Sequence, residues 1–236
     1  MEVKRYALDD TTRRPNYRQL AERINFHERS ELTPHLTPHL TPHFNSPFNS
    51  PFNSPKIYII VLRSSKLRLR AVEPEDLDLM YLIENDTALW PCGQASVPFS
   101  HYALKQYIAE SSNDFFHDRQ LRLVIETSEG IAAGFIDLQN YEPLHHRAEV
   151  GIVVVPEQQR KGLATEALRL LAKYVTLHLG IHQLYALVPE GNTASVGLFK
   201  KCGYKETATL QDWLNSPQGW QAVIVFQQVV SDYELL

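Results

Sequence analysis

The alternation of apolar and polar residues predicts a domain in which strands and helices follow one another from about residue 62. Runs with period-two alternation or short apolar stretches predict strands at 66–71, 121–127, 131–139, 148–155, 184–189, 204–210 and 221–229. Helical periodicity and capping residues predict helices at 73–83, 101–111, 163–179 and 192–202. The pattern therefore predicts an α/β (α+β) domain of six or seven strands and about four helices.

A short basic turn joins the strand at 148–155 to the helix that follows it, and reads Pro-Glu-Gln-Gln-Arg-Lys-Gly from residue 156. Such a turn points several backbone N–H groups, and the positive end of a helix, at one spot. That spot favours a diphosphate. Gly162 and Ala164 keep side chains away from it, while Arg160 and Lys161 add positive charge. The glycine spacings of a Walker loop and of a dinucleotide-binding turn are both absent.

A second motif follows about thirty residues later, where 192–204 read Asn-Thr-Ala-Ser-Val-Gly-Leu-Phe-Lys-Lys-Cys-Gly-Tyr. Asn192 is typical of the residue that caps the start of a helix, and Gly203 of the residue that ends one. Val196, Leu198 and Phe199 are expected to face the sheet. The two motifs thus lie at consecutive junctions between a strand and a helix.

In order and spacing, the two motifs resemble the signatures of the GNAT N-acetyltransferases. Gln159-x-x-Gly162-x-Ala164 is similar to the family signature Gln/Arg-x-x-Gly-x-Gly/Ala, which holds the diphosphate of coenzyme A. With the element order, the resemblance covers about three-quarters of the chain. It implies the GNAT fold, a mixed central sheet of about six or seven strands flanked by about four helices, which splays between its fourth and fifth strands. The stretches LRLRAVEPEDL, LQNYEPLHHRAEVGIVV and KKCGYKETATL look like the spermidine/diamine and ribosomal-protein N-terminal acetyltransferase branch.

The resemblance implies that acetyl-CoA is the co-substrate and that its diphosphate lies at the basic turn. The cofactor-binding residues it implies are Ile152, Val153, Val154, Gln159, Arg160, Lys161, Gly162, Leu163, Ala164, Thr165 and Asn192. Structural alternatives stay open for several of them. The β-branched side chains suit a buried strand with or without a cofactor, and Asn192 has a reason to be present as a helix cap alone.

Glu149 is the candidate general base, because it is an ionisable residue on an otherwise apolar strand. Burial would raise its pKa towards a useful range, although an ion pair with Arg147 or a neighbouring strand is the alternative. The resemblance implies that a tyrosine hydroxyl protonates the departing thiolate at the position of Phe199, which has no such group. Ser195, one helical turn earlier, is the candidate replacement, with Tyr185, Tyr204 or a water as alternatives.

The acceptor is expected near the end of the first helix, where Glu84, Asp86 and Trp90 bring carboxylates beside an aromatic ring. These groups suit a polyamine through charge pairing and cation–π contact, although polar residues are ordinary in such loops. We expect an N-acetyltransferase for a primary amine, preferably a polyamine or diamine such as spermidine. The alternatives are the N-terminal amine of a ribosomal or other protein, and a CoA-binding module without turnover.

Residues 1–61 differ from the rest in composition, because prolines recur at 34, 38, 42, 47, 51 and 55 within TPHL-like and NSPF repeats. Proline at this spacing opposes helices and strand ladders, so we predict that 1–61 are a low-complexity, disordered N-terminal extension before a GNAT domain at 62–236. A short helix is predicted at 17–32. His35, His39 and His43 fall within the repeat, which we interpret as a repeat expansion, and we predict no metal site.

Composition sets the remaining expectations. Of two cysteines, Cys92 and Cys202, neither has ligand-like spacing, which argues against a disulfide framework or zinc site and favours a reducing cytoplasm. The apolar run 57–62 is too short to span a membrane. Residues 1–64 carry nine Lys and Arg against six Asp and Glu, a small excess without interleaved aromatics. We therefore expect neither a nucleic-acid nor a membrane partner, and we leave a homo-oligomer open.

Overall fold

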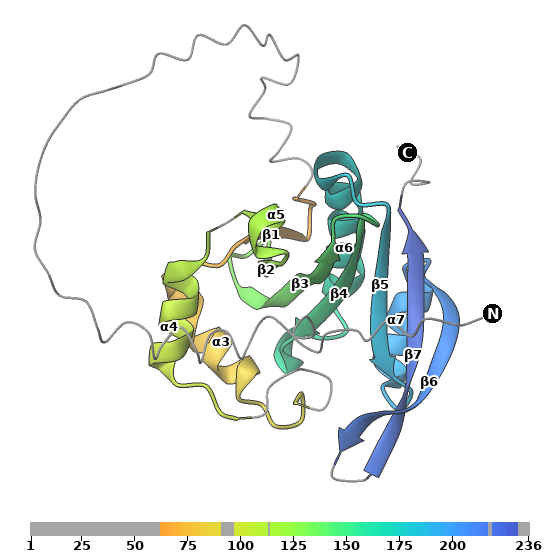
Figure 1. Cartoon of the computed structure of the whole chain (residues 1–236). Helices are drawn as coiled ribbons and strands as arrows, with labels where there is room; N and C mark the ends of the chain where they lie inside the picture. Colours follow the sequence, from red (N-terminus) through yellow and green to blue (C-terminus); the bar gives the residue numbers. More distant parts are fainter. Residues whose placement is uncertain (1–61, 91–96, 113, 217–218, 231–236) are drawn as a thin grey trace, which may run out of the picture. The chain divides into compact units, whose positions relative to one another are not determined.

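The computed structural model describes residues 62–90, 97–112, 114–216 and 219–230. Seven strands form one sheet in the order β1-β2-β3-β4-β5-β7-β6 (Figure 1). The strands are β1 (Leu67–Ala71), β2 (Leu121–Thr127), β3 (Ala132–Glu142), β4 (Arg147–Val154), β5 (Gln183–Pro189), β6 (Lys205–Ser216) and β7 (Gly219–Val229). The α-helices are α3 (Leu77–Glu84), α4 (His101–Glu110), α5 (Phe115–Asp118), α6 (Leu163–Tyr174) and α7 (Thr193–Lys201).

The predicted order of elements is confirmed, with differences at the boundaries. The first helix begins with a 3-10 turn at Pro74–Asp76, and α6 is followed by a π turn at Val175–Leu179. The hairpin of β6 and β7 is longer than predicted. Helix α5 was missed because its four residues are too few to show a 3.6-residue period. The predictions for 1–61, and Cys92, lie outside the described residues.

The pairing of β4 and β5 sets the position of the site. These two strands are parallel and pair at only three positions, Arg147 with Gln183, Ala148 with Leu184, and Glu149 with Tyr185. In contrast, β3 pairs with β4 as far as Val154, and β5 pairs with β7 as far as Pro189. The sheet is therefore open between β4 and β5 beyond Glu149. The predicted splay between the fourth and fifth strands is confirmed.

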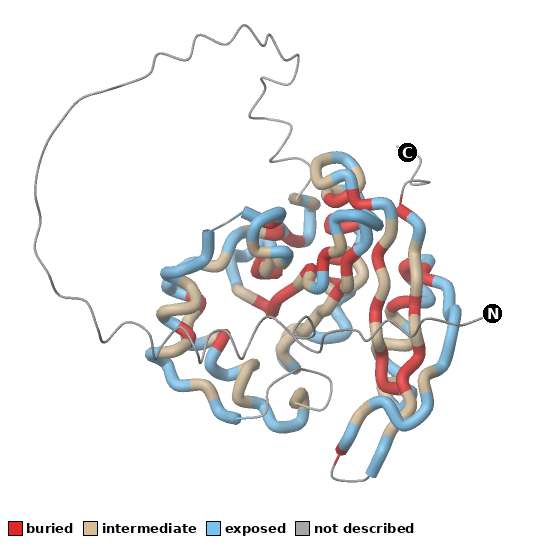
Figure 2. The backbone as a smooth tube through the Cα atoms, in the orientation of Figure 1, coloured by how far each residue is buried: buried red, intermediate tan, exposed pale blue. Residues whose placement is uncertain are grey.

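Different helices pack on the two faces of the sheet, through two separate clusters of apolar residues. Ala148 and Val150 of β4 belong to the main core, together with residues of α6, α7, β5 and β7. Val153 packs on the opposite face in a smaller cluster with Met80 of α3 and Leu104 of α4. Alternate residues of a strand point to opposite faces, so Glu149 lies on the α3 and α4 side. Buried positions follow the central strands, whereas β6 is exposed over most of its length (Figure 2).

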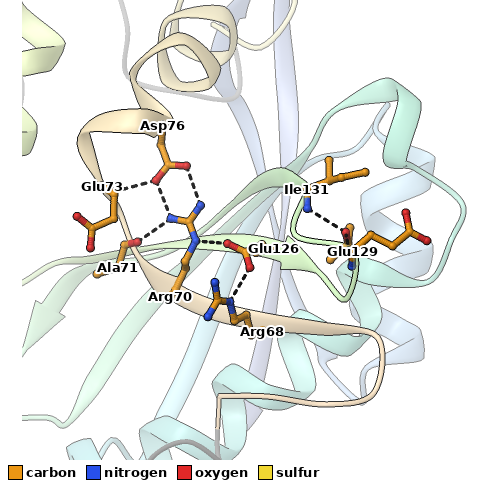
Figure 3. A network of polar contacts seen from close by, with 9 residues as sticks. Arg68, Arg70, Ala71, Glu73, Asp76, Glu126, Glu129 and Ile131 are labelled. Atoms are coloured by element: carbon orange, nitrogen blue, oxygen red, sulfur yellow. Dashed lines mark hydrogen bonds and ion pairs between the residues drawn. The ribbon is translucent and has the colours of Figure 1, made fainter.

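A network of ion pairs fixes the start of the domain (Figure 3). Glu126 on β2 accepts hydrogen bonds from Arg68 at 2.6 Å and from Arg70, both on β1. Arg70 also makes two bonds to Asp76, at 2.7 and 2.9 Å, and Asp76 accepts from the backbone N–H of Glu73. The network thus joins β1 and β2 to the 3-10 turn that leads into α3.

Among the helices of the described ranges, none is both long and apolar enough to pass through a membrane. Over the same ranges, no three His, Cys, Asp or Glu side chains are grouped as ligands of a metal ion would be.

Candidate functional site

The basic turn after β4 has the shape that the sequence predicted. Gly162 adopts a φ of +80° immediately before α6, a conformation that glycine takes without strain. The N–H groups of the first turn of α6 have no partner within the helix, and they point out of its positive end. Gln159 donates from Nε2 to the Val154 carbonyl oxygen at 2.9 Å, which ties the turn to the end of β4. Leu163 is buried, while Ala164 and Thr165 are half-buried.

The basic side chains at the turn differ in their surroundings. Arg160 is exposed and has a φ of +60°, and the Lys161 ammonium donates to the Gln158 side-chain oxygen at 2.8 Å. Sequence reasoning missed a further cation. The Lys66 ammonium lies 3.8 Å from the position that a Cβ would take at Gly162. Lys66 immediately precedes β1, so only the fold brings it to the turn.

The strand segment before the turn has one open side. Ile152 and Val154 pack against the main core, and Val153 packs against the α3 and α4 cluster. All three pair with β3, but the β4–β5 ladder ends at Glu149. The backbone edge of this segment that faces β5 is therefore outside the ladder, and a chain-like ligand with amide groups would find hydrogen-bonding partners there.

Glu149 lies at the point where β4 and β5 separate. Its Oε2 accepts a hydrogen bond from Asn140 Nδ2 on β3 at 2.8 Å, and the carboxylate also accepts one from the Tyr185 hydroxyl on β5. Burial raises the pKa of Glu149, and these two neutral donors offset only part of that effect. The ion pair with Arg147 considered as an alternative is not formed among the described residues. A carboxylate with a raised pKa is suited to accept a proton from an amine.

Tyr185 shares this environment. Burial and the negative charge of Glu149 raise the pKa of Tyr185 to about 12, while Arg147 acts in the opposite direction. The hydroxyl therefore keeps its proton at neutral pH. Arg147, Tyr185 and neighbouring side chains also line an open hollow of about 350 Å³, whose other lining residues are Gln183, Thr207, Val225 and Gln227.

In and around helix α7, residues of the second sequence motif, 192–204, cap the helix and pack in the core. The Asn192 side chain accepts a hydrogen bond from the Ser195 backbone N–H at 3.0 Å, so its oxygen serves as the helix cap. Phe199 is only 3% exposed and packs against Phe226 and Tyr204 in the main core. Ser195 is half-buried one turn earlier. Gly203, with a φ of +88°, ends the helix as predicted.

The three candidate acceptor residues lie together at the end of α3. Trp90 Nε1 donates to the Glu84 carbonyl oxygen at 2.9 Å, and Asp86 accepts from the Ala88 N–H. The Glu84 carboxylate accepts from Arg122 Nη1 at 2.5 Å, a contact that sequence reasoning missed. An amine that binds Glu84 must therefore share it with Arg122, whereas the Asp86 side chain is exposed.

Arg122 is held from several sides. Its Nε and Nη2 bond to Asp137 at 2.9 Å each, and its guanidinium lies 5.3 Å from the centre of the Phe135 ring. Burial acts to lower the pKa of Arg122, but Asp137 and Glu84 outweigh it and the pKa is raised. The arginine therefore stays charged and anchors α3 to β2 and β3.

The predicted site residues thus form two groups. The turn, the open edge of β4 and Glu149 are consecutive along one path, which leads from the N-terminal end of α6 to the Glu149 carboxylate. Phe199 and the Asn192 oxygen are engaged in the core and the cap. An elongated molecule with a diphosphate at one end fits the first group and brings its other end to Glu149.

The family and sequence comparisons agree with this arrangement. A family model described as an acetyltransferase (GNAT) domain matches residues 66–205. The spermidine N(1)-acetyltransferase of Escherichia coli is 28% identical over 144 residues, which span 60% of this chain and 74% of that protein.

Solved structures show the same likeness. The crystal structure of Vibrio cholerae spermidine N-acetyltransferase in complex with CoA and spermine superposes with a TM-score of 0.63 at 27% identity, covering 72% of this chain and 99% of that one. A dodecameric structure of that Vibrio cholerae enzyme in an intermediate state gives a TM-score of 0.61 at 27% identity, with 73% and 98% coverage.

Proposed function

This chain belongs to the GNAT acetyltransferase family, and from that premise we propose that it transfers the acetyl group of acetyl-CoA to a polyamine or diamine such as spermidine. It is an acetyl-CoA-dependent N-acetyltransferase, which removes the alternative of a binding module without turnover. The observation that carries the mechanism is the position of Glu149. A proton acceptor with a raised pKa lies where the sheet opens beside an anion-binding turn.

The proposed cofactor contacts follow the path from the turn to the opening. The N–H groups at Gly162, Leu163 and Ala164 receive the diphosphate, and the exposed Arg160 adds charge. The open edge of Ile152–Val154 receives the amide groups of the pantetheine arm. Lys66 joins the cations at the turn, because its ammonium already lies beside Gly162.

In the proposed transfer the neutral amine attacks the thioester carbonyl carbon while Glu149 accepts the amine proton. Holding both reactants at the opening replaces a bimolecular encounter by an intramolecular step. The thiolate is a tolerable leaving group, so the loss of a tyrosine hydroxyl at Phe199 slows its departure without preventing it. Ser195 remains our candidate donor to the thiolate, because it is half-buried one helical turn before Phe199 on α7.

The polyamine preference rests on the acceptors in the names of the relatives and on the acids near the end of α3. Asp86 is exposed beside Trp90, which allows a second ammonium group of the acceptor to bind there. The test is free-thiol release by the full chain with spermidine, spermine, putrescine and a panel of peptides. Spermidine or spermine should give the highest kcat/KM.

The control for this screen is Asp86→Asn, which removes the charge and keeps the shape. We expect it to raise KM for spermidine several-fold without changing KM for a monoamine whose alkyl tail carries no charge. Equal kcat/KM for spermidine and monoamines of the same length would contradict the polyamine assignment, while leaving acetyl transfer itself in place.

The N-terminal amine of a protein is the second candidate acceptor, and the hollow beside Tyr185 favours it. Arg147, Gln183 and Gln227 line that hollow, and they suit a peptide carbonyl better than an ammonium group. If peptides give a higher kcat/KM than polyamines in the same screen, this second function replaces the first. Arg147→Met should then lower kcat/KM for peptides and leave that for spermidine unchanged.

We also propose that the protein self-associates, since a related acetyltransferase of Vibrio cholerae is dodecameric. Light scattering on the full chain tests this directly. A monomer at micromolar concentration, with and without spermine, would contradict it. The cytoplasmic location, the boundary near residue 62 and the absence of a nucleic-acid partner remain predictions.

A further inference from the structure

The last cross-strand pair of β4 and β5 is built from two ionisable residues. Glu149 and Tyr185 lie directly opposite each other, and the strands separate immediately beyond them. Neighbouring strands run about 4.8 Å apart, and directly opposite residues point to the same face. The Tyr185 hydroxyl is within reach of the Glu149 carboxylate and donates a hydrogen bond to it.

The carboxylate is thus held from both sides. Asn140 reaches it from β3 at 2.8 Å, and Tyr185 reaches it from β5. Asn140 has a φ of +53° and lies where the β3–β4 register shifts, so the backbone is shaped to bring this amide to Glu149. Two donors on different strands leave a carboxylate little freedom to rotate.

Neither donor carries a charge. Among the described residues, the groups that face Glu149 are Gln139 and Asn140 from β3, Tyr185 from β5, and Arg147 two residues along β4. Asp137, the next acid on this face of β3, is bound to Arg122. The donors therefore fix the direction of the carboxylate without removing its basicity, as an arginine in their place would.

We propose that Tyr185 is a positioning residue of the acetyl transfer, which holds the Glu149 carboxylate towards the opening between β4 and β5. The inference rests on the proposed function. In the step it serves, the amine nitrogen forms a bond to the carbonyl carbon, and its proton moves to Glu149. The C–S bond breaks with its electron pair on sulfur, while Tyr185 keeps its own proton throughout.

The first test is the pH profile of kcat for Tyr185→Phe. Removing a donor to the charged carboxylate should raise the pKa of Glu149, so the acidic limb should move to higher pH. We expect kcat to fall about tenfold, as for a lost hydrogen bond to a charged group, with KM values for both substrates nearly unchanged. Tyr141→Phe, which removes a hydroxyl from a buried tyrosine of β3, is the matched control and should leave the limb in place.

A double-mutant cycle separates positioning from general damage. If Tyr185 acts through Glu149, then adding Tyr185→Phe to Glu149→Gln should cause almost no further loss of kcat. An equal fold-loss in both backgrounds would overturn the proposal, because it would mean that Tyr185 acts independently of Glu149.

A titration without turnover keeps this inference separate from the proposed function. The carbon-13 shift of the Glu149 side-chain carboxyl, followed against pH in the full chain, should have a higher midpoint in Tyr185→Phe than in the parent. Asn140→Gly, which suits the positive φ and removes the other donor, should shift it in the same direction. An unchanged midpoint in Tyr185→Phe refutes the positioning role, whereas failure of every tested amine to cause thiol release refutes only the proposed function.

Discussion

Glu126 on β2 and Glu149 on β4 belong to the same sheet, but their surroundings shift their pKa values in opposite directions. Two arginines hold Glu126, and the bond from Arg68 is the largest of the effects that lower its pKa. Burial raises the pKa of Glu149, and its partners are a carboxamide and a phenol. One carboxylate is thus compensated by cations and the other is only held in place.

Under the proposed function, the difference separates a structural acid, Glu126, from a catalytic one, Glu149. Glu126 and Asp76 stabilise the join between β1, β2 and the turn before α3, and a proton acceptor there would be too weak a base to be useful (Figure 3). Glu149 lies at the opening of the sheet and stays basic because no lysine or arginine in the described ranges is paired with it. Neutral partners, more than burial alone, distinguish the candidate site from the rest of the sheet.

The largest expected effect is that of Glu149→Gln. Loss of the proton acceptor should lower kcat by roughly 10²- to 10⁴-fold, with KM for acetyl-CoA nearly unchanged. Because the raised pKa means that the folded state binds a proton more tightly, stability from this group declines as pH rises above 4.5. Glu149→Gln should therefore melt no lower than the parent at neutral pH. Full kcat in this variant would remove Glu149 from the chemistry.

Glu126→Gln should show the reverse behaviour. It weakens charged hydrogen bonds to Arg68 and Arg70, and we expect a loss of about 2 kcal/mol, discounted because Arg68 is half-exposed. That corresponds to a Tm lower by about 4–8 °C for a domain of this size. The kcat of the folded protein should be retained. A large loss of kcat with unchanged Tm would contradict the comparison.

The same pair predicts a pH dependence of stability. The pKa of Glu126 is lowered in the folded state, so its contribution is present above its unfolded pKa of 4.5 and is lost as pH falls through the folded pKa. Urea unfolding of the parent and of Glu126→Gln should therefore converge as the pH is lowered below about 4.5. A constant difference between them down to the acid transition would show that the ion pairs are not its cause.

A substitution that gives Glu149 a cation sharpens the contrast further. Gln139 lies directly opposite Glu149 on β3, so Gln139→Lys places an ammonium beside the carboxylate. The acidic limb of kcat should move to lower pH, and kcat on the plateau should fall because the base is weaker. Gln139→Met, uncharged and of similar length, should leave the limb unchanged. A shift in both variants would point to packing as the cause.

The sequence predicted the order of the elements well because each long strand and helix carries its own period and its own caps. Glu149 became a candidate because of its polarity on an apolar strand, and the turn because of its local spacing, and both roles stay predictions. The partners of these residues were not visible in the same way. Asn140 reaches Glu149 through a shift in strand register, and Arg122 meets Glu84 across 38 positions. Such contacts depend on how segments distant in the sequence pair with each other, and the local sequence pattern does not predict that pairing.

Substitution of Lys66 should give the smallest of the expected effects. It extends the comparison from paired and unpaired acids to paired and unpaired basic side chains. Arg68 and Arg70 are bound by carboxylates, whereas Lys66, just before them, extends its ammonium to Gly162 and forms no ion pair within the described ranges. Lys66→Met should raise KM for acetyl-CoA about threefold, with kcat unchanged, as expected for one solvent-exposed contact to a phosphate. The difference should diminish at high salt.

The matched control is Lys173→Met. Lys173 lies in the last turn of α6, the helix that begins directly after Gly162. This substitution removes the same charge far from the positive end of that helix, so KM for acetyl-CoA should stay at the parent value. If both variants raise KM equally, the effect reflects the total charge of the protein, and Lys66 has no particular place at the turn. A change confined to Lys66→Met, and absent with a dephosphorylated thioester such as acetyl-pantetheine, would assign the ammonium to the diphosphate end of the cofactor.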